Sequence, residues 1–98
     1  MIMAKTRVWV LTALFTTDNV DETEIDVISV HSNVNDAVDA KDKCFEETKK
    51  DWLDEGMTED KMYLIHHTMV SVLKAKDNTK QVEYGIYAKD IDNGYNLE

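Results

Sequence analysis

Two adjacent histidines, His66 and His67, are the residues in this sequence whose types and spacing most suggest chemistry. They stand in the apolar run KMYLIHHTMVSVL, from Lys61 to Leu73. Metal-binding pairs on a helix normally occupy positions i and i+4, as in HExxH, a motif that the chain lacks. In a strand, the two side chains project from opposite faces, because side chains alternate with a period of two. Neither arrangement lets this pair chelate one ion.

A third histidine, His31, could approach one of the pair across a sheet. A site of ordinary ligands would still need an Asp or Glu whose position the sequence does not specify. We therefore predict no metal and no cofactor. A histidine-containing metal-binding or enzymatic domain remains an alternative.

Nucleophilic chemistry has equally little support. Cys44 is the only cysteine, which excludes an intrachain disulfide and a cysteine-rich zinc site. It falls on the apolar stripe of an expected helix, where a free cysteine behaves as a small buried hydrophobe. The three serines occupy no nucleophile elbow, and the three glycines form no phosphate-binding loop. The sequence predicts a non-enzymatic protein with no catalytic residues.

Composition narrows the classes of partner. The chain has 20 acidic and 11 basic residues, a formal charge of -9, so a nucleic-acid polyanion would be repelled. We expect no direct nucleic-acid binding. The same charge leaves a rival hypothesis, in which acids at residues 18–26 and 36–55 mimic a nucleic acid and inhibit a basic DNA- or RNA-binding protein.

Length and the two ends set the domain organisation. With 98 residues, 43% of them hydrophobic, the chain suits one domain over residues 1–96. Leu97 and Glu98 resemble the residue pair left by a purification tag. The basic and apolar N-terminus lacks an obvious cleavage site, and no stretch approaches the roughly 20 apolar residues of a spanning helix. We expect a cytoplasmic protein with no membrane role.

The elements that must position these residues begin with two strands. The run from Arg7 to Thr17 is rich in β-branched and aromatic residues, and both of its alternating faces are apolar. A polar turn over 18–23 leads to a second alternating run, Glu24 to Ser32. This second run places Ile25 and Val27 on one side and Ile28 and Val30 on the other. The pair predicts a hairpin.

A helix is expected next. Asn33 or Asn35 can cap its N-terminus, and Gly56 can end it. An apolar stripe at 100° per residue predicts that Phe45 and Trp52 pack on the sheet. Lys41 interrupts the stripe, and we expect its stem to lie along apolar surface while its ammonium reaches water.

The remaining chain predicts a second hairpin. The segment from Met62 to Lys76 contains β-branched residues and alternates in its later part, and turn residues at 77–80 precede a further alternating run over 81–91. The predicted fold is therefore α+β, in the order ββαββ, with a four-stranded and mainly antiparallel sheet and one helix packed on one face.

The apolar excess of the first strand gives the functional hypothesis. One helix can cover only one side of a four-stranded sheet, so one face of the first strand needs other cover, either from the chain's own loops and termini or from another chain. The candidate partner surface is Trp9, Leu11 and Phe15, and the opposite set with Val8, Val10 and Leu14 is the alternative. We expect a protein-interaction or accessory module that uses a sheet face or edge to bind a protein partner or to form a weak homodimer.

Overall fold

A computed structural model describes residues 4–17 and 23–93. These residues form one helix, a short 3-10 turn and five strands. The elements are β1 (Ala4–Thr17), β2 (Glu24–His31), α1 (Val34–Asp54), η2 (Glu59–Lys61), β3 (Met62–His66), β4 (Val70–Ala75) and β5 (Lys80–Asn93). The α+β class and the one helix agree with the prediction, whereas the strand count does not.

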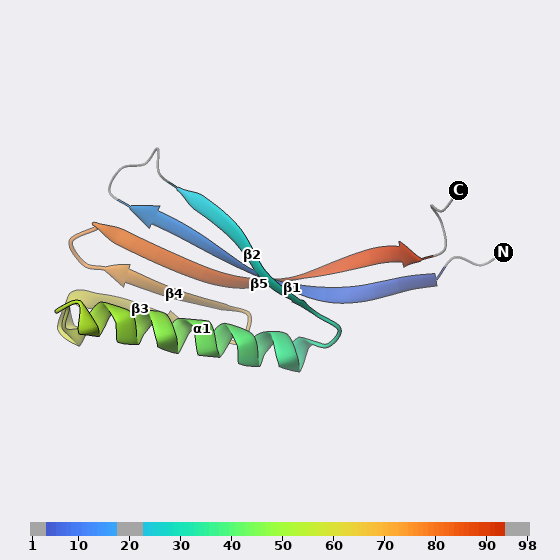
Figure 1. The fold of residues 1–98 in the computed structure, drawn as a ribbon, viewed down its shortest axis with the longest axis horizontal. Helices are drawn as coiled ribbons and strands as arrows, with labels where there is room; N and C mark the ends of the chain where they lie inside the picture. The colour runs from blue at the N-terminus through green and yellow to red at the C-terminus, as the bar shows by residue number, and fades with distance from the viewer. Residues whose placement is uncertain (1–3, 18–22, 94–98) are drawn as a thin grey trace.

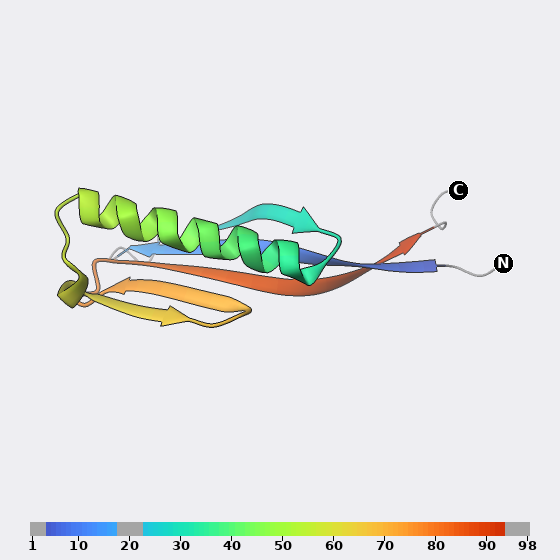
Figure 2. The same ribbon diagram turned by 90° about the horizontal axis from the view of Figure 1, so that it is seen from below.

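The five strands make one antiparallel sheet in the order β2-β1-β5-β4-β3 (Figure 1). The first and last strands of the chain, β1 and β5, pair along their whole lengths at its centre. Helix α1 crosses one face of the sheet, and the other face has no covering layer in the described part of the chain (Figure 2). The observed order is ββαβββ, so the predicted four strands and ββαββ order are wrong in detail.

The extra strand comes from a turn inside the histidine run. Strand β3 ends at His66, and His67 N donates to Val70 O at 2.9 Å to start β4. The predicted placement of His66 and His67 on opposite faces of one strand is therefore wrong. The loop residues, Thr68 and Met69, are neither Gly, Pro, Asn nor Asp, so the sequence carries no turn signal here. The later turn over 76–79 has such residues and was predictable, with Asn78 at φ 65.

The first hairpin contains a bulge that changes which residues share a face. Strands β1 and β2 pair as predicted, but Leu11 pairs with Ser29 while Thr12 pairs with Val27. Ile28 is the extra residue, and an extra residue in one strand reverses the alternation beyond it. Ile25, Val27 and Val30 consequently lie on the same face, which corrects the predicted split between Ile25 and Val27 on one side and Ile28 and Val30 on the other.

Both ends of α1 follow rules readable from sequence. Of the two predicted caps, Asn33 is the one used, since its side chain accepts from Asp36 N at 2.9 Å. At the other end Gly56 has φ +104, and Met57 N donates to Trp52 O at 3.1 Å while Gly56 N donates to Leu53 O at 3.0 Å. This is the Schellman arrangement that a left-handed glycine permits.

The core lies between α1 and the sheet. The buried residues of the helix include Phe45 and Trp52, as predicted, and they face the apolar residues of the three central strands and Met62. The sheet side of the core consists of Leu11, Ala13, Met62, Leu73, Ala75, Val82, Tyr84 and Ile86.

Beyond this core, β1 and β5 continue as a two-stranded ribbon. Residues 4–8 pair only with residues 89–93, because β2 ends opposite Trp9 and the ladder with β4 ends at Gly85. The ribbon projects past the helix and contributes to a longest dimension of 58 Å (Figure 1). It carries an exposed ion pair, in which Arg7 Nε lies 2.9 Å from Asp90 Oδ1.

Candidate functional site

His66 and His67 lie in different environments. The His66 ring packs on Phe45 with centroids 4.8 Å apart, and its Nδ1 lies 3.0 Å from Ser71 Oγ. His67 is exposed in the turn. The third histidine, His31, has Nε2 2.7 Å from Ser29 Oγ on β2. Across residues 4–17 and 23–93 no three His, Cys, Asp or Glu side chains come together as a metal site would require.

A buried lysine joins the helix to the β3–β4 hairpin. The Lys41 side chain is fully buried, so the expectation that its ammonium reaches water is wrong. Its Nζ donates to Ser71 Oγ at 2.8 Å and to the carbonyl oxygen of His67 in the turn. Asp42 Oδ1 lies 3.1 Å from the same ammonium and 3.5 Å from His66 Nε2. Oδ1 has no hydrogen-bond partner within the described ranges, so its approach to the Lys41 ammonium is a charge contact, and its approach to His66 is one only when the imidazole is protonated.

This network has the ingredients of a nucleophile and a base but lacks access. Ser71 Oγ is within hydrogen-bond reach of both Lys41 Nζ and His66 Nδ1, the type of spacing that activates a serine. Ser71 and Lys41 are both 0% exposed, so a substrate cannot approach the hydroxyl. The arrangement instead satisfies buried polar groups across the interface between helix and sheet. Sequence reasoning missed it, although Lys41 lies one helical turn from both Ala37 and Phe45.

Cys44 is half-buried and packs against the core. Burial raises the pKa of its thiol, and the charge of Glu47 raises it further against the opposite influence of Lys43. A raised pKa keeps the thiol protonated and unreactive at neutral pH.

The uncovered face of the sheet is the largest functional candidate. Strand pairing places even-numbered residues of β1 opposite odd-numbered residues of β5 on this face, and the register extends it to β2, β4 and β3. Its apolar and aromatic members include several of the most exposed in the chain: Ile25 at 71%, Val27 at 65%, Val30 and Tyr87 at 56%, Tyr63 at 55% and Ile65 at 46%. The half-buried members are Val8, Val10, Leu14, Val70 and Val72.

At the centre of this face, Tyr87 lies over Gly85. A Cβ built on Gly85 would meet the Tyr87 hydroxyl oxygen at 3.1 Å and ring carbons at 3.2 and 3.3 Å. The ring thus occupies the space that a side chain at residue 85 would take, and it remains 56% exposed. The charged residues that pairing places on this face in β1, β4 and β5 are Glu83, Lys74 and Lys89. We call this surface the open face.

The predicted partner residues lie on the other side. Leu11 is fully buried beneath α1, and Trp9 and Phe15 pack partly buried against the same core. The alternative set of Val8, Val10 and Leu14 is the one on the open face. Which face the helix covers was not derivable from β1, because both of its alternating faces are apolar.

The described parts of the two predicted acidic clusters, residues 18–26 and 36–55, lie on different elements. Asp18, Asp21 and Glu22 of the first predicted cluster lie outside the described residues, while Glu24 and Asp26 are exposed on β2. Most acids of α1 are exposed too. Two acids at and just beyond the C-terminal end of this helix, Glu55 and Glu59, are each paired with a lysine. Lys49 Nζ lies 2.8 Å from Glu59 Oε1, and Lys80 Nζ lies 2.6 Å from Glu55 Oε1 and over the Trp52 ring.

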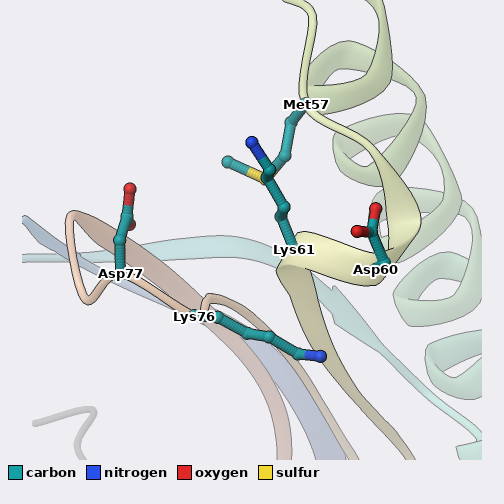
Figure 3. A pocket seen from close by; sticks show the side chains of 5 residues that line it. All are labelled: Met57, Asp60, Lys61, Lys76 and Asp77. Atoms are coloured by element: carbon teal, nitrogen blue, oxygen red, sulfur yellow. The ribbon is translucent and has the colours of Figure 1, made fainter.

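An open cavity of about 390 Å³ lies where η2 meets the β4–β5 turn, lined by Met57, Asp60, Lys61, Lys76 and Asp77. The charged ends of these side chains do not converge on one point (Figure 3). Hydrogen bonds from Thr58 and Thr79 lower the pKa of Asp60 and Asp77, respectively. Both carboxylates therefore stay ionised near neutral pH and are poorly suited to general acid chemistry.

The described residues contain no helix long and apolar enough to cross a membrane. Comparison of the chain with protein-family models, with curated proteins and with solved structures found no match.

Proposed function

We propose that this protein is a small, non-enzymatic interaction or accessory module that binds a protein partner through the open face. The observation that carries the proposal is a broad sheet face, rich in exposed apolar side chains, on the side of a five-stranded sheet that the helix does not cover. Five strands about 4.8 Å apart and about seven residues of 3.3 Å each give a face of roughly 500 Å². Large exposed apolar patches on a monomer commonly mark binding sites.

The arrangement of the face supports protein over other ligands. It is broad and formed by strands, whereas small-molecule sites are concave. Tyr87 and Tyr63 give it two exposed aromatic side chains, a residue type enriched among the anchors of protein interfaces. The net charge of -9 opposes direct binding of nucleic acid.

The rival function, mimicry of a nucleic acid, would depend on the acids at residues 18–26 and on the exposed acids of α1. The lysines beside them weaken a single-sign field, and the open face has no role in that reading. The two functions make different predictions about salt. Apolar burial survives moderate salt, while charge-steered association slows as the Debye length falls from about 10 Å at 0.1 M to 3 Å at 1 M.

The test compares two sets of variants in pull-downs from the native host at low and high salt. One set removes apolar contact area from the open face (Val27→Ser with Tyr87→Ser). The matched control changes exposed positions on the outer side of α1 (Glu46→Ser with Lys50→Ser). We expect one salt-resistant protein to be retained by wild type and by the control, and lost from the open-face variant.

A second arm addresses mimicry with Asp39→Asn, Glu46→Gln and Glu47→Gln combined. Recovery of a basic nucleic-acid-binding protein, lost at high salt and in this variant but kept by the open-face variant, would overturn the proposed function. Circular dichroism and urea unfolding of each variant confirm that the comparison is made between folded proteins.

A further inference from the structure

The two free edges of the sheet differ in how they are protected against pairing. The β2 edge carries the acids Glu24 and Asp26 and a bulge at Ile28, all devices that discourage another strand from adding to a sheet. The β3 edge reads Met-Tyr-Leu-Ile-His, with no acid, lysine or proline. Its three central residues, Tyr63, Leu64 and Ile65, are 55%, 42% and 46% exposed. The β3 edge is thus the unprotected one.

Hydrogen-bond parity identifies which backbone groups point outward from β3. Lys76 N donates to Lys61 O and His67 N donates to Val70 O, both at 2.9 Å. On the β3 side of the hairpin, the odd-numbered residues are therefore the ones whose backbone groups bond to β4. In an antiparallel pair, the alternate residues direct their N–H and C=O groups away from the partner strand. Leu64 and His66 therefore direct their N–H groups to the free edge, whereas Met62 N already donates to Glu59 O.

We propose that β3 pairs antiparallel with β3 of a second copy, about a two-fold axis at Leu64, to form a continuous ten-stranded sheet. In this register Leu64 exchanges two N–H···O bonds with Leu64 of the second copy. Each His66 N–H meets the outward carbonyl of Met62 in the other copy. Four N–H groups that have no partner among residues 4–17 and 23–93 are satisfied, and each Met62 keeps its bond to Glu59.

The side chains are also complementary in this register. On the open face, Tyr63 lies opposite Ile65 of the second copy, and aromatic with β-branched pairs are favourable across strands. On the helix face, Leu64 lies opposite its own counterpart, and Met62 lies opposite His66. No like charges face each other within the paired strands.

The fold leaves space for the second copy. Helix α1 makes its main contacts with β1, β2, β4 and β5, and Figure 2 shows β3 at the outer margin of the sheet. Both helices would lie on the same side of the joined sheet, because the axis is perpendicular to it. The two open faces would then form one surface of about twice the area. The pairing does not require that surface to bind anything, so it stands apart from the proposed function.

A five-residue edge contact belongs to the small and weak end of protein interfaces. Two chains of charge -9 also repel each other, and added salt screens that repulsion. We therefore expect a reversible dimer that increases with protein concentration and with salt. Sedimentation velocity over a concentration series at low and high salt measures both dependences.

Two variants test the contact itself. Leu64→Lys places like charges opposite each other at the axis, and Leu64→Pro removes an outward N–H that β3 does not use for β4. The matched control, Ile25→Lys, makes the same charge change on the exposed part of the other edge strand. We expect dissociation constants about tenfold or more higher for both Leu64 variants and unchanged for the control, a change of at least about 1.4 kcal/mol.

Amide hydrogen exchange can distinguish the β3 residues whose N–H groups point to the free edge from those whose N–H groups bond to β4. The Leu64 and His66 amides should become protected as concentration rises, while those of Tyr63 and Ile65 should be protected throughout. A monomer at every concentration, or a dimer weakened by Ile25→Lys and not by Leu64→Lys, would overturn the proposal. The second result would indicate packing between open faces. If the wild-type protein forms the dimer but captures no protein partner through the open face, the result counts against the proposed function alone.

Discussion

Within the described structure, Lys41 is a buried residue whose hydrogen bonds join the helix to the β3–β4 hairpin. It is the largest of the fully buried side chains, and its ammonium bonds both to a core serine and to the carbonyl of a turn residue, His67. A buried charge costs free energy to desolvate, and it is retained where good geometry and hydrogen bonds offset that cost. Here the ammonium holds the hairpin turn against the helix.

Replacing Lys41 should therefore destabilise the fold. Lys41→Ala leaves a cavity, removes one of the two side-chain partners of Ser71 Oγ and takes the lysine donor from the His67 carbonyl, and we expect a loss of about 3 kcal/mol in the free energy of unfolding. Lys41→Met fills most of the space and should cost about half as much. Urea denaturation with a common m-value measures both.

Lys43→Ala is the matched control, because Lys43 is exposed on the same helix. It should change stability by no more than about 0.5 kcal/mol. A Lys41→Ala protein as stable as this control would show that the buried network contributes nothing net.

At the scale of elements, α1 is the best-specified part of the chain. Its start and stop are local, since an asparagine cap and a left-handed glycine satisfy backbone groups that the helix leaves unpaired. The strands are less local, because their ends depend on which neighbours they find. The bulge at Ile28 and the turn after His66 both illustrate this.

The cap can be tested with two nearby asparagines. Asn33→Ala removes the acceptor for Asp36 N and should lower the free energy of unfolding by about 1 kcal/mol. Asn35→Ala, two residues further on and exposed, should be neutral or slightly stabilising, because alanine has the higher helix propensity. Thermal unfolding of both variants checks this, and equal effects would argue against a specific role for Asn33.

At the scale of the whole molecule, the fold is longer than its core. The helix covers the middle of the sheet, while the ribbon of residues 4–8 and 89–93 extends past it (Figure 1). Two paired strands without a packed layer are marginally stable in water. The Arg7–Asp90 ion pair adds little, since both side chains are exposed.

Amide hydrogen exchange should therefore differ along β1 and β5. We expect the amides of Val8 and Lys89 to exchange by local opening, far faster than those of Leu11 and Val82 in the core. Mass spectrometry of exchanging peptides from the two regions measures this. Equal protection in ribbon and core at low protein concentration would mean that the ribbon opens only with the whole fold.

The sequence by itself determined the features that depend on near neighbours. It determined the helix with its apolar stripe, the glycine that ends it, the first hairpin, and the turn that contains Asn78. Each has a short-range cause: period, cap, left-handed residue or turn chemistry. The α+β class follows from the order of these elements.

Only the tertiary structure decided the rest. The turn over 67–69 has no turn residues of its own, and a lysine 26 positions earlier in the chain bonds to its first carbonyl. The bulge at Ile28 gathers Ile25, Val27 and Val30 on one face through pairing with β1. Both faces of β1 are apolar, so the position of α1 alone selects which is core and which is open. These outcomes depend on contacts between distant segments, which a local pattern of residue types does not encode.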